Sequence, residues 1–131
     1  MIIVEGKIKG KSRPRITKVG HTYTPQDTVT YENWVKLCYQ QQCGKHLEGS
    51  IRATIIAYYK IPKSYSKLKR LDCALNILRP TKKPDIDNIA KIILDSLNKI
   101  AYEDDSQVVE LTVLKRYTEE AERIEFELCE M

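Results

Sequence analysis

The sequence predicts a single domain of mixed α/β class, with a small mixed sheet of about four strands and two or three helices packed on it. Three observations support this prediction. The chain has 131 residues, 42% of them hydrophobic, which suits one core and leaves no length for a second. Several short segments alternate apolar and polar residues, as strands do. Longer segments between them place apolar residues three and four apart, as helices do. We therefore expect residues 1–131 to form one domain.

The first half of the chain is expected to supply two strands and one helix. Residues 2–8 alternate apolar and charged side chains, which is typical of a half-buried strand. A basic loop broken by glycine and proline follows. From about Thr28 to Gly44, apolar residues recur at helical spacing. Residues 51–59 alternate again, and Pro62 should end that strand.

The second half is expected to supply the main helix and two more strands. Residues 64–80 are basic and weakly periodic, and their leucines suggest one short helix. Residues 86–100 place isoleucine and leucine at spacings of three and four, which is the strongest helix signal in the chain. Residues 109–113 and 124–128 alternate on either side of a polar stretch, which predicts an antiparallel hairpin.

Charge is divided unevenly along the chain. Residues 1–83 contain 17 Lys and Arg against 5 Asp and Glu, whereas residues 84–131 contain 5 against 13, within a net charge of +4. Such asymmetry is typical of a polyanion-binding surface beside a site that uses carboxylates. Two ordinary solvated faces are the alternative interpretation.

Composition excludes several other classes of protein. The chain lacks an apolar run long enough for a membrane span and a recognisable signal peptide, so we expect a soluble cytoplasmic protein with no membrane partner. Its four cysteines form no CxxC pair, and it has only two histidines. That pattern argues against a structural zinc site or a disulfide framework. We expect no small-molecule cofactor.

The stretch KKPDIDNIAK places two aspartates at the start of the strongest predicted helix. Pro84 disfavours helix at Lys83, so Asp85 should be the N-cap residue and Asp87 should lie in the first turn. An N-cap side chain can turn back over the first turn, so both carboxylates can meet at one point. Lys91 lies one turn after Asp87 on the same face. Helix capping and a surface ion pair are the structural alternative.

A second acidic cluster precedes the strand predicted from residue 109. Glu103, Asp104 and Asp105 are consecutive and repel one another, and a bound divalent cation would relieve that repulsion. Hard cations such as Mg²⁺ take oxygen ligands. Asp85, Asp87 and one or two of Asp104 and Asp105 would supply them, and a metal-activated water would then attack a phosphodiester.

The basic part of the chain is expected to hold the phosphate backbone of DNA. Lys91 would instead stabilise negative charge in the transition state. The residues expected to contact DNA are a subset of the Lys and Arg side chains in this part of the chain: Lys11, Arg13, Arg15, Lys18, Lys69, Arg70, Lys82 and Lys83.

These motifs resemble the RusA-type Holliday-junction resolvases of bacteria and their phages. The resemblance rests on KPDIDNIAK, with a D-x-D-N-x-x-K core from Asp85 to Lys91, and on DDSQV at residues 104–108. The preceding elements SRPR and YTP extend it. It implies a RusA-like endonuclease domain in which Asp85, Asp87 and Asp105 are catalytic metal ligands. It also implies that Lys91 is a catalytic lysine and Asp104 a neighbouring acid.

The resemblance further implies a homodimer that depends on Mg²⁺, with Mn²⁺ as a possible substitute. Its two active sites would resolve four-way DNA junctions by paired symmetric nicks, in DNA recombination or repair, in a bacterial or phage-infected cell. The chain departs from the best-known members in residues 64–80 and in its N-terminal loop. These departures bear on the selectivity for junctions more than on the metal site.

Other interpretations remain open at the level of sequence. The chain could be a basic nucleic-acid-binding protein without catalysis, or a less selective metal-dependent nuclease of branched DNA. Pro84 and Asp85 also suggest a PD-(D/E)xK nuclease, but Glu110-Leu111-Thr112 lacks the lysine of that motif. A D-x-D glycosyltransferase would need a larger domain.

Overall fold

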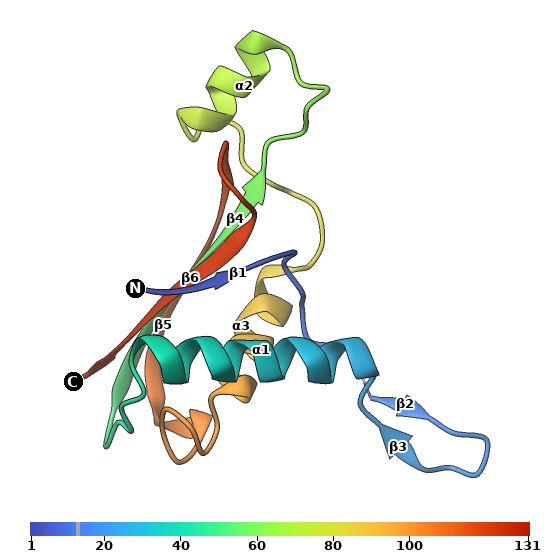
Figure 1. Cartoon of the computed structure of the whole chain (residues 1–131), viewed down its shortest axis with the longest axis vertical. Helices are drawn as coiled ribbons and strands as arrows, with labels where there is room; N and C mark the ends of the chain where they lie inside the picture. Colours follow the sequence, from blue (N-terminus) through green and yellow to red (C-terminus); the bar gives the residue numbers. More distant parts are fainter. Residues whose placement is uncertain (13) are drawn as a thin grey trace.

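The computed structural model describes residues 1–12 and 14–131 and shows one four-stranded mixed sheet with α1 and α3 packed on one face (Figure 1). The predicted α/β class is confirmed. None of the helices in the described ranges combines the length and apolar character that a membrane span requires. In chain order, the elements are β1 (Ile2–Glu5), β2 (Arg15–Ile16), β3 (Thr22–Tyr23), α1 (Gln26–Gln42), β4 (Ile51–Lys60), α2 (Lys67–Ala74), α3 (Ile86–Ser96), a 3-10 turn (Asp105–Gln107), β5 (Val108–Thr118) and β6 (Arg123–Glu130).

The order of strands in the sheet is β1-β6-β4-β5, so the expected hairpin of β5 with β6 is wrong. The two strands do run in opposite directions, but β4 lies between them, antiparallel to β6 and parallel to β5. Every second residue of β4 is buried from Ile51 to Tyr59, whereas Val109 and Leu111 of β5 stay exposed. The more apolar β4 therefore takes an interior place with a paired strand on each side, and β5 forms an edge of the sheet.

The core fills the space between the sheet and its two helices. Ile89, Ile92 and Ile93 of α3 are fully buried there, which confirms the predicted apolar face of this helix. Ile86, at the start of the same face, is exposed because the first turn of α3 extends past the core. Between α1 and β6, the rings of Tyr39 and Phe126 are stacked with centroids 6.3 Å apart.

The first strand is shorter than its alternating pattern suggested. It ends at Glu5 because Gly6 adopts a φ of 120°, a conformation that favours glycine, and the chain turns away from the sheet. On the open edge of β1, the side chain of Gln42 accepts from the N–H of Ile3 at 2.8 Å and donates to its C=O at 2.7 Å. One glutamine from α1 thus pairs with both backbone groups that Ile3 presents on this edge.

Replacing Gln42 with Ala should lower the free energy of unfolding by about 1–2 kcal/mol, because two backbone groups of β1 lose their partner. Urea denaturation measures the change. Gln41→Ala, one residue earlier on an exposed part of the same helix, is the matched control and should change stability by less than about 0.5 kcal/mol. Equal effects of the two substitutions would contradict a specific role for Gln42.

Candidate active site

The two aspartates of the DID stretch lie at the start of α3, as the sequence predicted. Asp85 is the N-cap residue, with φ −67° and ψ 155°, yet its side chain makes no capping hydrogen bond. The preceding backbone is held from the sheet instead, since the carbonyl of Pro84 accepts from Tyr59 Oη at 3.4 Å and from Lys115 Nζ at 3.1 Å. The helix start is therefore anchored without using the carboxylate of Asp85, which stays exposed.

A line of polar residues follows along the outer face of α3. Asp87 and Lys91 are exposed, and Asp95, two turns beyond Asp87, is partly buried. Lys11 Nζ lies 3.5 Å from a carboxylate oxygen of Asp95 and 2.9 Å from one of Glu32 in α1. Burial lowers the pKa of Lys11, but the hydrogen bonds and charges of Glu32 and Asp95 outweigh it and leave that pKa raised. Lys11 thus ties the N-terminal segment to both helices.

Asp105 is the member of the second acidic cluster that reaches α3. Its backbone N–H donates to Asn98 Oδ1 at 2.8 Å, and its carboxyl group lies against that of Asp95. Burial, the contact with Asp95 and the charge of Asp104 together raise the pKa of Asp105. Two carboxyl groups this close repel each other when both are ionised, and a cation bound to them would relieve that repulsion.

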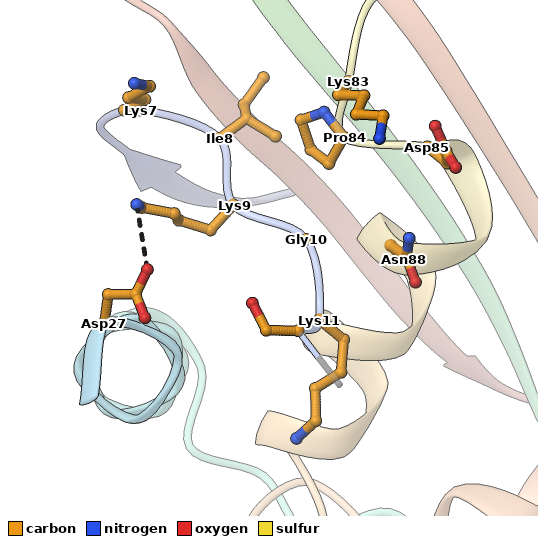
Figure 2. A pocket seen from close by; sticks show the side chains of 11 residues that line it. Lys7, Ile8, Lys9, Gly10, Lys11, Asp27, Lys83, Pro84, Asp85 and Asn88 are labelled. Atoms are coloured by element: carbon orange, nitrogen blue, oxygen red, sulfur yellow. Dashed lines mark ion pairs between the residues drawn. The ribbon is translucent and has the colours of Figure 1, made fainter. Parts of the chain in front are cut away.

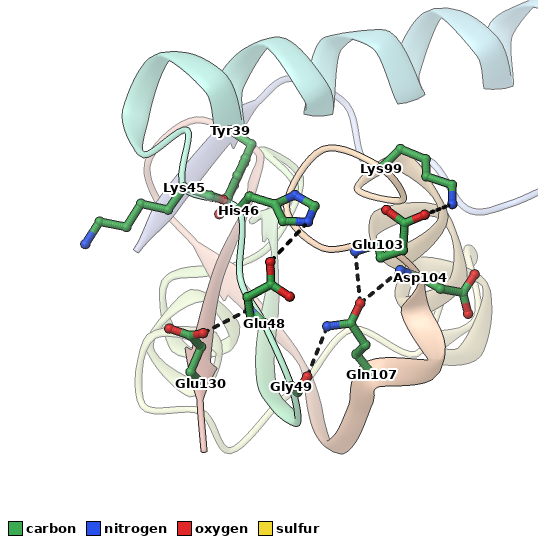
Figure 3. A network of polar contacts seen from close by, with 10 residues as sticks. All are labelled: Tyr39, Lys45, His46, Glu48, Gly49, Lys99, Glu103, Asp104, Gln107 and Glu130. Atoms are coloured by element: carbon green, nitrogen blue, oxygen red, sulfur yellow. Dashed lines mark hydrogen bonds and ion pairs between the residues drawn. The ribbon is translucent and has the colours of Figure 1, made fainter.

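Asp104 has a different role, and Figure 3 shows how Gln107 joins its backbone to Gly49. Its carboxylate accepts from the N–H of Ser106 at 3.0 Å and so caps the 3-10 turn. Gln107 completes the capping box by accepting from the N–H of Asp104 at 3.1 Å, and it also donates to the carbonyl of Gly49 at 3.0 Å. The hydrogen bonds from Ser106 lower the pKa of Asp104. Between the two aspartates that the sequence could not separate, the structure assigns the cap to Asp104.

The predicted ligands are not drawn into one cluster. Within residues 1–12 and 14–131, no group of three or more His, Cys, Asp or Glu side chains is arranged to hold a metal ion. The structure brings Asp105 to Asp95 and leaves Asp85 and Asp87 exposed at the other end of the helix face. The chemistry of the donors nevertheless suits a hard cation, because all of them are carboxylate oxygens.

A cavity of about 390 Å³ lies between the N-terminal segment and the start of α3 (Figure 2). Lys7, Lys9 and Lys83 line it together with Asp85 and Asp27, so three lysines share the cavity with a predicted catalytic carboxylate. Lys9 also pairs with Asp27 of α1, with Nζ 3.6 Å from the carboxylate. The arrangement suits a phosphate group placed beside the DID stretch.

On one side of the cavity, the N-terminal segment approaches the start of α3 closely at Gly10. A Cβ atom there would lie 2.7 Å from Cβ of Pro84 and 3.0 Å from Cβ of Asn88. The next residue, Lys11, donates its N–H to the carbonyl of Asn88 at 2.9 Å. The N-terminal segment therefore packs directly on the first turn of α3.

The predicted DNA-binding residues lie in two separate regions. In the N-terminal region, Arg15 belongs to β2 and Lys18 is exposed in the turn before β3, whereas Arg13 lies outside the described residues. Lys83 lines the cavity, and Lys82 Nζ lies 5.4 Å from the ring centroid of Tyr59.

The second region is α2 and its flanking residues. Lys69 Nζ lies 3.9 Å from the ring centroid of Tyr65 and remains exposed. Arg70 is half-buried and donates to the carbonyl of Pro62 at 3.1 Å, so its main contact is within the protein.

Two residues that contact the predicted site, Asp95 and Lys115, were not predicted from the sequence, although the sequence pattern gave a weak indication of each. Asp95 lies one turn after Lys91 on the face of Asp87, but nothing local marks it as a neighbour of Asp105. Lys115 alternates with Val113 and Tyr117 on β5 and so shares their side of the strand. Its pKa is lowered by burial, against the opposing charge of Asp85. The sequence pattern that could have indicated Lys115 is a lysine on the side of a strand that otherwise carries apolar residues.

Comparison with known proteins identifies the family. The family model described as endodeoxyribonuclease RusA matches residues 5–128. The chain belongs to the RusA endodeoxyribonuclease family. It is also 36% identical over 121 residues to the uncharacterized protein YqaN of Bacillus subtilis strain 168, a match that covers 90% of this chain and 83% of YqaN. The predicted family is confirmed, and with it the general class of activity: an endodeoxyribonuclease of the Holliday-junction resolvase type.

Gly10→Ala should detach the N-terminal segment from α3, because the added methyl group has no space between Pro84 and Asn88. We expect the free energy of unfolding to fall by about 1–3 kcal/mol, as for other overpacked sites. Urea denaturation tests this. Ser12→Ala, two residues along the same segment, is the control and should have little effect. Unchanged stability of the Gly10→Ala protein would contradict the close packing.

Proposed function

We propose that this RusA-family protein is a Mg²⁺-dependent, structure-selective endonuclease that resolves four-way DNA junctions by paired symmetric nicks. One observation carries the proposal. Asp85 is the N-cap residue of α3, yet its side chain makes no capping hydrogen bond, and Tyr59 and Lys115 hold the helix start through the carbonyl of Pro84. A carboxylate placed at a helix start without a structural hydrogen bond remains available for ligand chemistry.

The proposed metal ligands are Asp85, Asp87 and Asp105. Their oxygen donors suit Mg²⁺, and the crowding of Asp105 against Asp95 is the kind of repulsion that a cation relieves. When bound, Mg²⁺ supplies Lewis-acid polarisation of the phosphodiester and activates the attacking water. Asp95 acts as a positioning residue, since it contacts Asp105 and is itself held by Lys11. Asp104 is excluded from the proposed set because its carboxylate caps the 3-10 turn.

Lys91 and the cavity lysines complete the proposed mechanism. Lys91 lies on the same outer face of α3 as Asp87, where its exposed ammonium group can stabilise the negative charge that develops on the phosphate. Lys7, Lys9 and Lys83 would hold a phosphate of the DNA backbone beside Asp85 and orient the strand. Their contribution is positioning, because phosphate contacts carry no sequence information.

We further propose that the active form is a homodimer. A four-way junction has two-fold symmetry, and paired nicks require two active sites related by the same symmetry. Sedimentation equilibrium, with and without junction DNA, would show twice the 15.2 kDa mass of one chain if this is correct.

Cleavage of synthetic DNA tests the function directly. A labelled four-way junction and a linear duplex of the same sequence are incubated with the protein in Mg²⁺, in Ca²⁺ and in EDTA. We expect paired nicks in the junction with Mg²⁺ alone and no cutting in EDTA. Binding without cleavage in every condition would instead indicate a nucleic-acid-binding protein. Equal cutting of junction and duplex would indicate a less selective nuclease.

The neighbouring aspartates provide a matched pair for the metal site. Asp105→Asn should reduce junction cleavage by about 100-fold or more, because a ligand is lost, while DNA binding is kept or strengthened. It should also reduce the rise in melting temperature that Mg²⁺ produces in the absence of DNA. Asp104→Asn weakens only a cap, so cleavage and the Mg²⁺-dependent shift should remain close to those of the wild type. Loss of cleavage in Asp104→Asn with normal cleavage in Asp105→Asn would contradict this assignment and indicate that Asp104 is the ligand.

A further inference from the structure

Residues 62–82, which we call the arm, project from one end of the sheet and carry α2 away from the rest of the molecule (Figure 1). The base of the arm is well anchored. Ile61 donates its N–H to the carbonyl of Thr118 at 2.9 Å, and the rings of Tyr65 and Tyr117 meet edge to face with centroids 6.3 Å apart. Cys73 is buried against the protein. The arm is therefore a fixed projection.

The outer side of the arm is apolar. Leu68, Leu71 and Leu75 follow one another at spacings of three and four and so lie on one side of α2, with exposed fractions of 72%, 52% and 60%. Ile77 follows with 70%. Arg70 and Cys73, on the opposite side of the helix, face the protein. We call the four exposed residues the apolar stripe. Large apolar side chains gathered on a projection usually mark an interaction site.

The charge of the arm indicates what occupies this stripe. The arm contains six Lys or Arg and one Asp. Lys67 and Lys69 flank the stripe on its two sides, given their positions around the helix. Two copies of a surface with this charge would repel each other, whereas a polyanion would be attracted. The partner must combine negative charge with apolar surface that can cover leucine side chains.

Branched DNA offers both features at the point where its strands exchange. Phosphates carry the charge, and base pairs at the branch point expose their faces when they unstack. Leucine and isoleucine inserted between base steps are a general means by which proteins open DNA. The arm also runs directly into the candidate site, since its last residues precede Asp85 and Lys115 holds the connecting backbone.

We propose that the apolar stripe is a wedge that packs against unstacked bases at the branch point of a four-way junction, while Lys67 and Lys69 contact the adjoining phosphates. This proposal rests on the proposed function and adds to it the element that distinguishes a junction from a duplex. The wedge would hold the branch point at a fixed distance from the carboxylates of α3, because both ends of the arm are anchored to the sheet.

The test replaces the wedge and leaves the charge. Leu68→Gln and Leu71→Gln are combined in one protein. The matched control combines Val109→Gln and Leu111→Gln, which are exposed on β5 away from the arm. Affinity for a junction and for a duplex of the same sequence is measured in Ca²⁺. A junction with 2-aminopurine at the branch point reports unstacking through its fluorescence.

We expect the wild-type protein to increase the 2-aminopurine fluorescence and the wedge variant to lose this increase. The preference for junction over duplex should fall by about tenfold, which corresponds to partial loss of an apolar contact, with duplex affinity unchanged. Lys67→Gln with Lys69→Gln should weaken binding to both DNAs and reduce the salt dependence. Retained preference and fluorescence in the wedge variant, or similar losses in the control, would overturn the proposal.

Parallel measurements separate the possible failures. A change in molecular mass caused by the wedge variant, with no DNA present, would show that the stripe joins two copies of the chain and would overturn the DNA assignment. If the wild-type protein cuts the junction in Mg²⁺ and the wedge variant binds and cuts it equally well, the wedge proposal is overturned and the proposed function stands. A wild-type protein that neither binds nor cuts the junction would overturn both proposals. If the double variant does not fold, Leu68→Gln, at the most exposed stripe position, gives the same test.

Discussion

Burial of the isoleucine face of α3 is the constraint on which the candidate site depends. Ile89, Ile92 and Ile93 are fully enclosed between the sheet and α1, so the rotation of the helix about its own axis is determined. Side chains on the opposite face must then point outward, which is where Asp87 and Lys91 lie. A hydrophobic contact on one side of a helix thus positions the proposed catalytic groups on the other.

Neighbouring strands and loops bring the remaining groups to that helix. The carbonyl of Pro84 accepts hydrogen bonds from Tyr59 and Lys115, which lie on adjacent strands. These bonds fix the position of the start of α3 relative to the sheet. At the other end, Asn98 receives the backbone N–H of Asp105 and places its carboxyl group against Asp95. The proposed site is therefore held by strands at one end and by the loop after α3 at the other, and these contacts set the positions of its carboxylates.

Acidic residues that look equivalent in the sequence have different physical roles. Asp104 and Asp105 are adjacent, yet one caps a turn through Ser106 and the other extends toward α3. Asp85 shows the opposite case, because its position predicts a cap that its side chain does not make. Lys11 was expected to contact DNA, but it lies between Glu32 and Asp95, where it joins the N-terminal segment to two helices. Whether it also meets phosphate stays a prediction.

The sequence by itself determined the α/β class, the main helices, the family and the position of the DID stretch at a helix start. These features depend on local spacing, capping and the partition of apolar residues, all of which act over a few positions. Only the tertiary structure decided that β4 separates β5 from β6, that Asp95 meets Asp105, and that the leucines of the arm stay exposed. These outcomes depend on contacts between distant segments, where the burial of the whole sheet outweighs local pattern.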